Sequence, residues 1–135
     1  MRPMYESKAD LSREAGVAAS LSSAWDCTSH KLPLQYRIDF AMLVDGSVKA
    51  WLEVKCRNRY YDEMILSAGK FSAGQQLAMT TGHPFVVAFG IGDQIYWRNC
   101  TGDKPEIYIG GRTDRGDSQD IEPVVMLPLQ HFHLL

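Results

Sequence analysis

The chain has 135 residues, of which 45% are hydrophobic and 22% charged, with a net charge of −2 at pH 7. That charge argues against a protein that coats nucleic acid non-specifically, and no apolar run approaches the ~20 residues needed to cross a membrane. We therefore expect one soluble domain over 1–135, with a core at about 7–100 and accessory strands and a tail at 101–135. Three scattered cysteines predict reduced thiols and a cytoplasmic location.

A helix is predicted over residues 7–25, with Ser7 as its N-terminal cap. Its apolar stripe consists of Leu11, Ala18, Leu21 and Trp25. Glu14 lies within that stripe, at a position where leucine would be expected. A buried carboxylate is costly unless it is paired or bound to a metal. Glu14 therefore either belongs to a site or reaches from the edge of the stripe to solvent and a nearby arginine.

The next predicted element is a hairpin from Tyr36 to Lys55, after a connector at 27–34. The hairpin has a period of two and divides at Asp45-Gly46, a dipeptide that favours tight turns. Every even-numbered residue of its two strands is apolar. The odd-numbered face carries Asp39, Glu53 and Lys55.

The register of this hairpin follows from its two faces, because a slip of one residue would mix them. A three-residue loop over 45–47 would place Asp39 opposite Glu53, with their Cβ atoms roughly 5 Å apart. Two carboxylates at that distance repel unless a cation lies between them, and their oxygens favour Mg²⁺, Mn²⁺ or Ca²⁺. The alternative is a solvated polar face of a sheet.

Asp39, followed after thirteen residues by Glu53-Val54-Lys55, resembles the motif of the PD-(D/E)XK nuclease superfamily, with Ile38 where a proline often stands. The similarity is to small phage nucleases and Holliday-junction resolvases. It implies a restriction-endonuclease-like α/β fold with an αβββαβ core and a mixed central sheet flanked by helices. It also implies a Mg²⁺ cofactor, for which Mn²⁺ would substitute, and assigns catalysis to Asp39, Glu53 and Lys55. The implied metal ligands are Glu14, Asp39, Glu53 and the backbone carbonyl of Val54.

The densest basic and aromatic run follows directly at 55–61. If Lys55 faces the site, Arg57 and Arg59 continue on the same side and, with Tyr60, can bind nucleic-acid phosphates. The alternative is a solvated loop after a strand.

A second helix is predicted from Ser67 to Thr81, with Gly82 just past its end. As a crossover it would make the flanking strands parallel and would pack on the even-numbered face of the hairpin. Nucleases of the superfamily often carry a lysine or glutamine on this helix. The resemblance therefore assigns Gln75 to catalysis and Lys70 to a phosphate contact.

The remaining chain predicts mostly strands. Residues 84–91 form a continuous apolar run typical of a buried central strand, with 94–98 as its hairpin partner. The third core strand is assigned to 64–66, and 106–109 and 124–127 are accessory strands. A polar segment at 113–120 and a tail carrying His131 and His133 complete the chain.

Together these features predict metal-dependent hydrolysis of phosphodiester bonds by a DNA endonuclease. The chain is too short for a separate sequence-reading domain, so cleavage is expected to be structure-selective or weakly sequence-specific, on branched or single-stranded DNA. The resemblance suggests a role in DNA replication, recombination or repair, for a phage within the host cytoplasm. A homodimer through the Trp97 strand or the tail is expected. The alternatives are a non-catalytic nucleic-acid-binding or assembly protein that retains the fold, and a plain scaffold.

Overall fold

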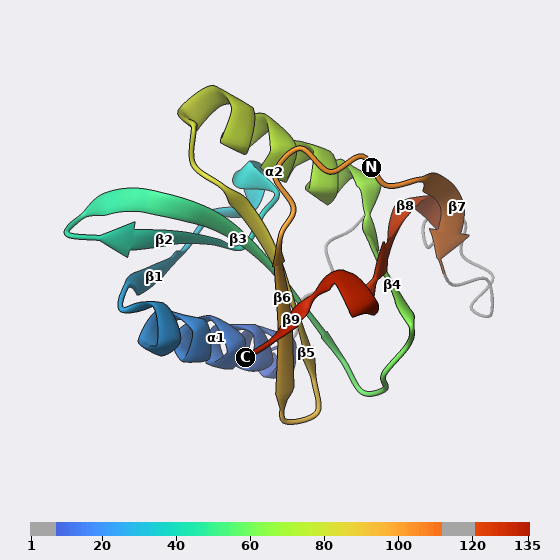
Figure 1. Cartoon of the computed structure of the whole chain (residues 1–135), viewed down its shortest axis with the longest axis horizontal. Helices are drawn as coiled ribbons and strands as arrows, with labels where there is room; N and C mark the ends of the chain where they lie inside the picture. The colour runs from blue at the N-terminus through green and yellow to red at the C-terminus, as the bar shows by residue number, and fades with distance from the viewer. Residues whose placement is uncertain (1–7, 112–120) are drawn as a thin grey trace.

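The computed structural model describes residues 8–111 and 121–135, in which two helices cover the two faces of a mixed sheet (Figure 1). The helices are α1 (Lys8–Trp25) and α2 (Ala68–Thr81). None of the helices in these ranges is long and apolar enough to cross a membrane. The predicted cap Ser7 and the polar segment 113–120 lie outside the described residues.

The central sheet has six strands in the order β1-β2-β3-β5-β6-β9. Its strands are β1 (Thr28–Lys31), β2 (Phe40–Val44), β3 (Ser47–Arg57), β5 (Phe85–Ile91), β6 (Gln94–Asn99) and β9 (His133–Leu134). β3 and β5 run parallel, and each other neighbouring pair is antiparallel. The elements α1, β1, β2, β3, α2 and β5 form the predicted αβββαβ core.

The third core strand is not the one that the sequence indicated. It is β1, which lies within the predicted connector and pairs with β2 at the edge of the sheet. Its residues are mostly exposed, so no apolar alternation marked it. Residues 64–66 do form a strand, β4 (Glu63–Ser67), but it belongs to a second sheet with β8 (Ile121–Pro128) and β7 (Ile107–Gly111).

The two helices lie on opposite sides of the central sheet (Figure 1). Val17, Ala18 and Leu21 of α1 pack on the even-numbered face of the hairpin, with Leu52 among their neighbours. The crossover helix α2 packs with Trp51 on the odd-numbered face, so the prediction that it covers the even-numbered face is wrong. The inner strands of an α/β sheet are buried on both faces, and Trp51 supplies apolar surface to the second face.

The hairpin turn is also shorter than predicted. Asp45 and Gly46 both have positive φ values, 51° and 78°, and form a two-residue turn that pairs Val44 with Ser47. The register then shifts by one residue, with Lys49 as the extra residue of a bulge. Beyond the bulge Phe40 pairs with Leu52, and this register, extended by one residue, brings Asp39 level with Glu53 as predicted.

The limits of α2 agree with the sequence. The Ser67 side chain caps the helix by accepting a hydrogen bond from the Lys70 N–H, and Gly82 ends it with a φ of 76°. A Cβ atom on Gly74 would lie 2.2 Å from the Phe85 ring, so α2 lies directly against β5 at this point. This close contact fixes the height of Lys70 relative to the sheet.

The C-terminal residues do not form a free tail. His133 and Leu134 form β9, in which His133 pairs with Trp97 and its ring lies 4.7 Å from the Trp97 ring between centroids. The edge of β6 at Tyr96 and Trp97 is therefore paired with β9. These C-terminal residues were predicted to be a free tail, and instead they extend the central sheet.

Candidate active site

The site begins where the central sheet opens. The pairing of β2 with β3 ends at Phe40 and Leu52, whereas β3 continues to Arg57 in register with β5. The Val54 N–H, just past the end of the β2 pairing, donates instead to Asp39 Oδ2 at 2.9 Å. This bond fixes the Asp39 carboxylate against β3 beside Glu53.

Glu53 is the most unusual side chain of the cluster. It is fully buried, and neither of its carboxylate oxygens has a hydrogen-bond partner among the described residues. Lys70 Nζ lies 3.4 Å from Glu53 Oε2, which is within ion-pair distance but lacks hydrogen-bond geometry. Burial raises the pKa of Glu53 well above its usual range, the Asp39 charge raises it further, and Lys70 only partly opposes both effects.

Two lysines face these carboxylates from different elements. Burial acts to lower the pKa of Lys70, but the negative charges of Glu53 and Asp39 outweigh it and hold that pKa above its usual value. The pKa of Lys55, two residues beyond Glu53 on β3, is lowered by burial and then by the charges of Arg57 and Lys70. Lys55 and Lys70 are thus part of one electrostatic cluster with the carboxylates.

Glu14 approaches this cluster from the opposite face of the sheet. Its Oε1 atom is buried. Its charge partly opposes the lowering of the Lys55 pKa and adds to the raising of the Lys70 pKa. The N-terminal half of α1 lies near the end of β3, since Arg13 Nη2 donates to the Arg57 carbonyl at 3.3 Å. Because β2 ends at Phe40, a carboxylate from α1 can approach Lys55 past the end of that strand.

The donor chemistry of the cluster suits a hard divalent cation. Asp39 and Glu53 supply carboxylate oxygens, and those of Glu53, which accept no hydrogen bond from the described residues, could bind a cation. As the side chains lie, no three His, Cys, Asp or Glu residues within 8–111 and 121–135 are grouped closely enough to hold a metal ion. Coordination by Glu14 together with Asp39 and Glu53 would therefore require these carboxylates to move closer together.

Sequence reasoning missed one cation of this cluster. Lys31 Nζ lies 3.4 Å from Asp39 Oδ1. Lys31 belongs to β1, the strand that was predicted to be a connector, and it pairs in register with Phe40. Recognising β1 as a strand would have placed Lys31 next to Asp39.

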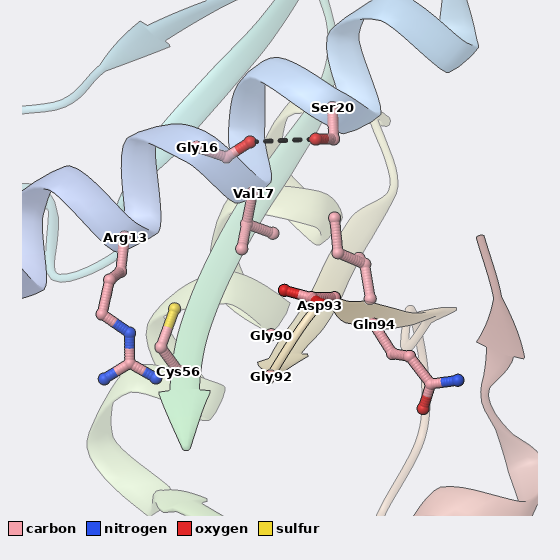
Figure 2. A pocket seen from close by; sticks show the side chains of 10 residues that line it. Arg13, Gly16, Val17, Ser20, Cys56, Gly90, Gly92, Asp93 and Gln94 are labelled. Carbon is pink, nitrogen blue, oxygen red and sulfur yellow. Dashed lines mark hydrogen bonds between the residues drawn. The ribbon is translucent and has the colours of Figure 1, made fainter. Parts of the chain in front are cut away.

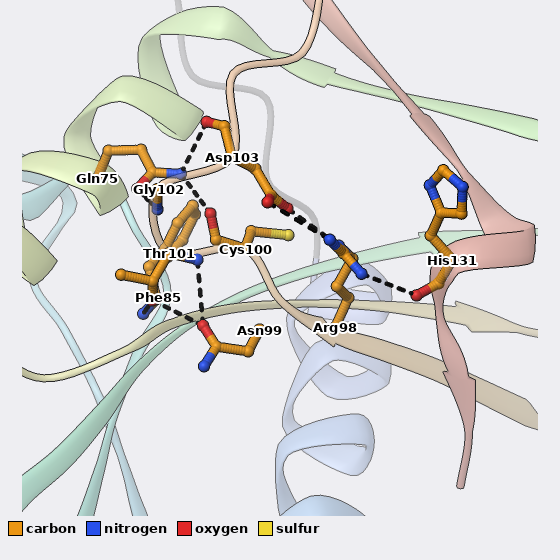
Figure 3. A network of polar contacts seen from close by, with 9 residues as sticks. All are labelled: Gln75, Phe85, Arg98, Asn99, Cys100, Thr101, Gly102, Asp103 and His131. Atoms are coloured by element: carbon orange, nitrogen blue, oxygen red, sulfur yellow. Dashed lines mark hydrogen bonds and ion pairs between the residues drawn. The ribbon is translucent and has the colours of Figure 1, made fainter.

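Gln75, which was assigned to catalysis, lies elsewhere. Its side-chain Nε2 donates to the Cys100 carbonyl at 2.6 Å, and its Oε1 accepts from the Gly102 N–H at 2.9 Å (Figure 3). Five residues along a helix turn a side chain by about 140° from Lys70. The structure therefore brings Lys70, and not Gln75, from α2 to the carboxylates.

The basic and aromatic run extends outward from Lys55. Arg57 ends β3, and the Arg59 guanidinium lies 5.4 Å from the centroid of the Tyr61 ring. Tyr60 is 53% exposed and makes an edge contact with Tyr96. Arg59 and Tyr60 are exposed and Arg57 is half-buried, and all three follow Lys55 closely along the chain.

A pocket of about 270 Å³ lies on the other face of β3 (Figure 2). Arg13 and Cys56 line it beneath α1, together with the turn at Asp93. Cys56 points away from the face that carries Lys55, since neighbouring residues of a strand alternate. This pocket is therefore separate from the carboxylates.

Comparisons with known proteins agree with the predicted fold. The model of a protein family described as "Phage putative PDDEXK endonuclease" matches residues 1–135. The structure of Hjc, a Holliday junction resolvase from the archaeal hyperthermophile Archaeoglobus fulgidus, matches with a TM-score of 0.57 and 14% identity over 89% of this chain and 87% of that chain. At that identity the likeness concerns the fold alone. No curated protein matches the chain.

Proposed function

Since this chain belongs to the phage PDDEXK endonuclease family, we propose that it is a metal-dependent DNA endonuclease. The observation that carries the proposal is Glu53, a buried carboxylate whose two oxygens have no hydrogen-bond partner in the described chain. Retaining such a group beside Asp39 costs stability, because desolvation and like charge both disfavour its ionised form. A cation bound between the two carboxylates would remove that cost.

The proposed ligands are Glu14, Asp39, Glu53 and the carbonyl of Val54, with Mg²⁺ as the ion and Mn²⁺ as a substitute. When bound, the ion supplies a water of lowered pKa and positive charge opposite the phosphate. The hydrogen bond between the Val54 N–H and Asp39 holds β3 and the Asp39 carboxylate in a fixed relation. Such rigid positioning of ligands favours a fixed coordination geometry.

Lys55 is the proposed catalytic lysine. It follows Glu53 by two residues on one strand, so its side chain extends on the same face. Its ammonium would donate to the attacking water or to the charge that develops on the phosphate. Lys70 would contact the same phosphate from α2, while Arg57, Arg59 and Tyr60 would hold flanking phosphates of the DNA.

The substrate we propose is DNA with a branch or a single-stranded part. Two features support it: the fold is shared with a protein whose name is Holliday junction resolvase, and the basic run beside the site is short. We further propose that the enzyme acts in phage replication, recombination or repair within the host cytoplasm. Cleavage of two strands would require a homodimer.

The test is cleavage of a panel of DNA structures by the purified chain in Mg²⁺ and Mn²⁺. The panel contains linear duplex, single strand, flap and four-way junction, each with an EDTA control. We expect cleavage that is lost in Asp39→Asn and reduced about 10²–10³-fold in Lys55→Met. Lys49→Met, at an exposed position near the hairpin turn, should cut at the wild-type rate.

If the chain cut no DNA form in either ion, the proposal that it is a DNA endonuclease would be refuted. If the chain then still bound the four-way junction, the alternative of a non-catalytic binding protein would hold. Cleavage that survives Asp39→Asn would show that a different site is responsible.

A further inference from the structure

Asp39 is held by a lysine from the neighbouring edge strand. Lys31 Nζ lies 3.4 Å from Asp39 Oδ1 and 5.6 Å from the centroid of the Phe40 ring. The side chain of Lys31 is 38% exposed, whereas that of Asp39 is 4% exposed. Lys31 therefore reaches a buried carboxylate from the solvent side.

The Lys31 side chain is less constrained by its surroundings than the Asp39 side chain. The stem of Lys31 lines an apolar pocket of about 430 Å³ with Leu11, Leu32 and Leu34, and long cationic side chains shift along such surfaces at little cost. The backbone pairing of β1 with β2 does not depend on where that ammonium lies. Asp39, in contrast, is fixed through Oδ2 by the Val54 N–H.

The ammonium of Lys31 occupies the free oxygen of Asp39 that a divalent ion would need. An ion bound to that oxygen would lie close to the ammonium, and the two positive charges would repel each other. Binding of the ion would therefore weaken the Lys31–Asp39 pair and favour release of the ammonium. The released ammonium stays within the length of its own side chain from the metal position, at the solvent side where DNA would approach.

We propose that Lys31 is a positioning residue that exchanges partners: it neutralises Asp39 until a divalent ion binds there, and it then binds a DNA phosphate next to the cleaved one. This inference rests on the proposed function, because it takes Asp39 as a metal ligand. It has a thermodynamic consequence. Ion binding and DNA binding strengthen each other by the same factor, and part of that factor comes from Lys31.

The first measurement is Mn²⁺ binding by calorimetry without DNA. An ion pair of this exposure contributes little, so Lys31→Met should bind Mn²⁺ about two- to fivefold more tightly than the wild type. Lys31→Arg, which can still pair with Asp39, should remain within twofold of the wild type. Lys49→Met, which removes a lysine from the far end of the hairpin, should leave Mn²⁺ binding unchanged.

The second measurement is binding of a four-way junction at several salt concentrations, once in Ca²⁺ and once in EDTA. In Ca²⁺ the slope of log K against log salt should fall by about one for Lys31→Met, because one phosphate contact is lost. In EDTA the slopes of variant and wild type should coincide, since Lys31 is then occupied by Asp39.

Two results would overturn the inference alone. One is Mn²⁺ binding by Lys31→Met that is unchanged or weaker; the other is a slope that falls equally in Ca²⁺ and EDTA, which would mean that Lys31 contacts DNA whether or not an ion is bound. In either case the wild type would still bind Mn²⁺ and cut DNA. A wild type that takes up no divalent ion and cuts no DNA would overturn the proposed function as well.

Discussion

Two polar clusters flank the central strands and are built in opposite ways. In the first, Gln75 bonds to Cys100 and Gly102, and Arg98 bonds to Asp103 with 2.9 Å between Nε and Oδ2 (Figure 3). Donors and acceptors are matched there. In the second, Glu53 is buried beside another carboxylate, and its oxygens lack hydrogen bonds in the described part of the chain.

The difference separates structural polar groups from functional ones. Buried polar groups that only stabilise a fold are normally hydrogen-bonded, and the loop at Cys100 follows this rule. A group left unsatisfied in a folded protein lowers its stability and persists where it serves binding or catalysis. The Gln75 network and the Glu53 cluster therefore predict opposite effects of removing a side chain.

The substitution Glu53→Gln is expected to have the largest effect on cleavage. Cleavage should fall at least about 10³-fold, while the free energy of unfolding at pH 8 without divalent ions should rise by roughly 1 kcal/mol, because a buried charge is removed. Activity assays and chemical denaturation measure the two. Glu63→Gln, the same substitution at an exposed position of β4, should change neither.

The pH dependence of stability gives the same contrast a second readout. The folded-state pKa of Glu53 is raised above its unfolded value of about 4.3, so the folded state binds the proton more tightly. The stabilising contribution of this proton to the free energy of unfolding is fully present below pH about 4.3. It is lost as pH rises through the folded-state pKa. Wild-type stability should therefore decline over this window more than that of Glu53→Gln. Equal declines in the two proteins would contradict a buried, ionising Glu53.

Gln75→Ala should have the opposite effects to Glu53→Gln, lowering stability and leaving cleavage unchanged. Loss of its amide leaves the Cys100 carbonyl and the Gly102 N–H without their partner, which should cost about 1–3 kcal/mol of unfolding free energy. Cleavage per folded molecule should stay at the wild-type level. Gln76→Ala, at the exposed next residue of α2, is the matched control and should change neither quantity.

A loss of kcat in Gln75→Ala without a loss of stability would break the comparison. It would restore Gln75 as a residue that acts on the substrate, as the resemblance to the superfamily first implied.

The sequence was sufficient for features that depend on local patterns. The pairing of the hairpin strands, the apolar run of β5 and the Ser67 and Gly82 limits of α2 each follow from neighbouring residues, and all are confirmed. The position of Asp39 opposite Glu53 was also predicted, although the length of the turn was not. A two-residue turn with a bulge and a three-residue turn leave the same register beyond Met42.

The sequence was insufficient where long-range pairing decides. β1 is an edge strand of polar residues, and only its partner β2 makes it a strand. Without β1, the contact of Lys31 with Asp39 could not be predicted. The contacts of the Gln75 side chain are with the loop after β6. No pattern along α2 predicts these contacts. Pairing over long sequence distances is what tertiary structure adds to local propensity.

The smallest expected effect distinguishes two arginines. Arg59 lies over the Tyr61 ring at the exposed end of the basic run, whereas Arg98 is tied to Asp103 and to the His131 carbonyl. Arg59→Ala should weaken binding of the four-way junction a few-fold, with a salt slope lower by about one and unchanged stability. Arg98→Ala should cost about 1 kcal/mol of unfolding free energy and leave the slope unchanged. If both variants lost stability alone, the basic run would be a solvated loop, and the DNA surface would have to lie on the Lys31 side of the carboxylates.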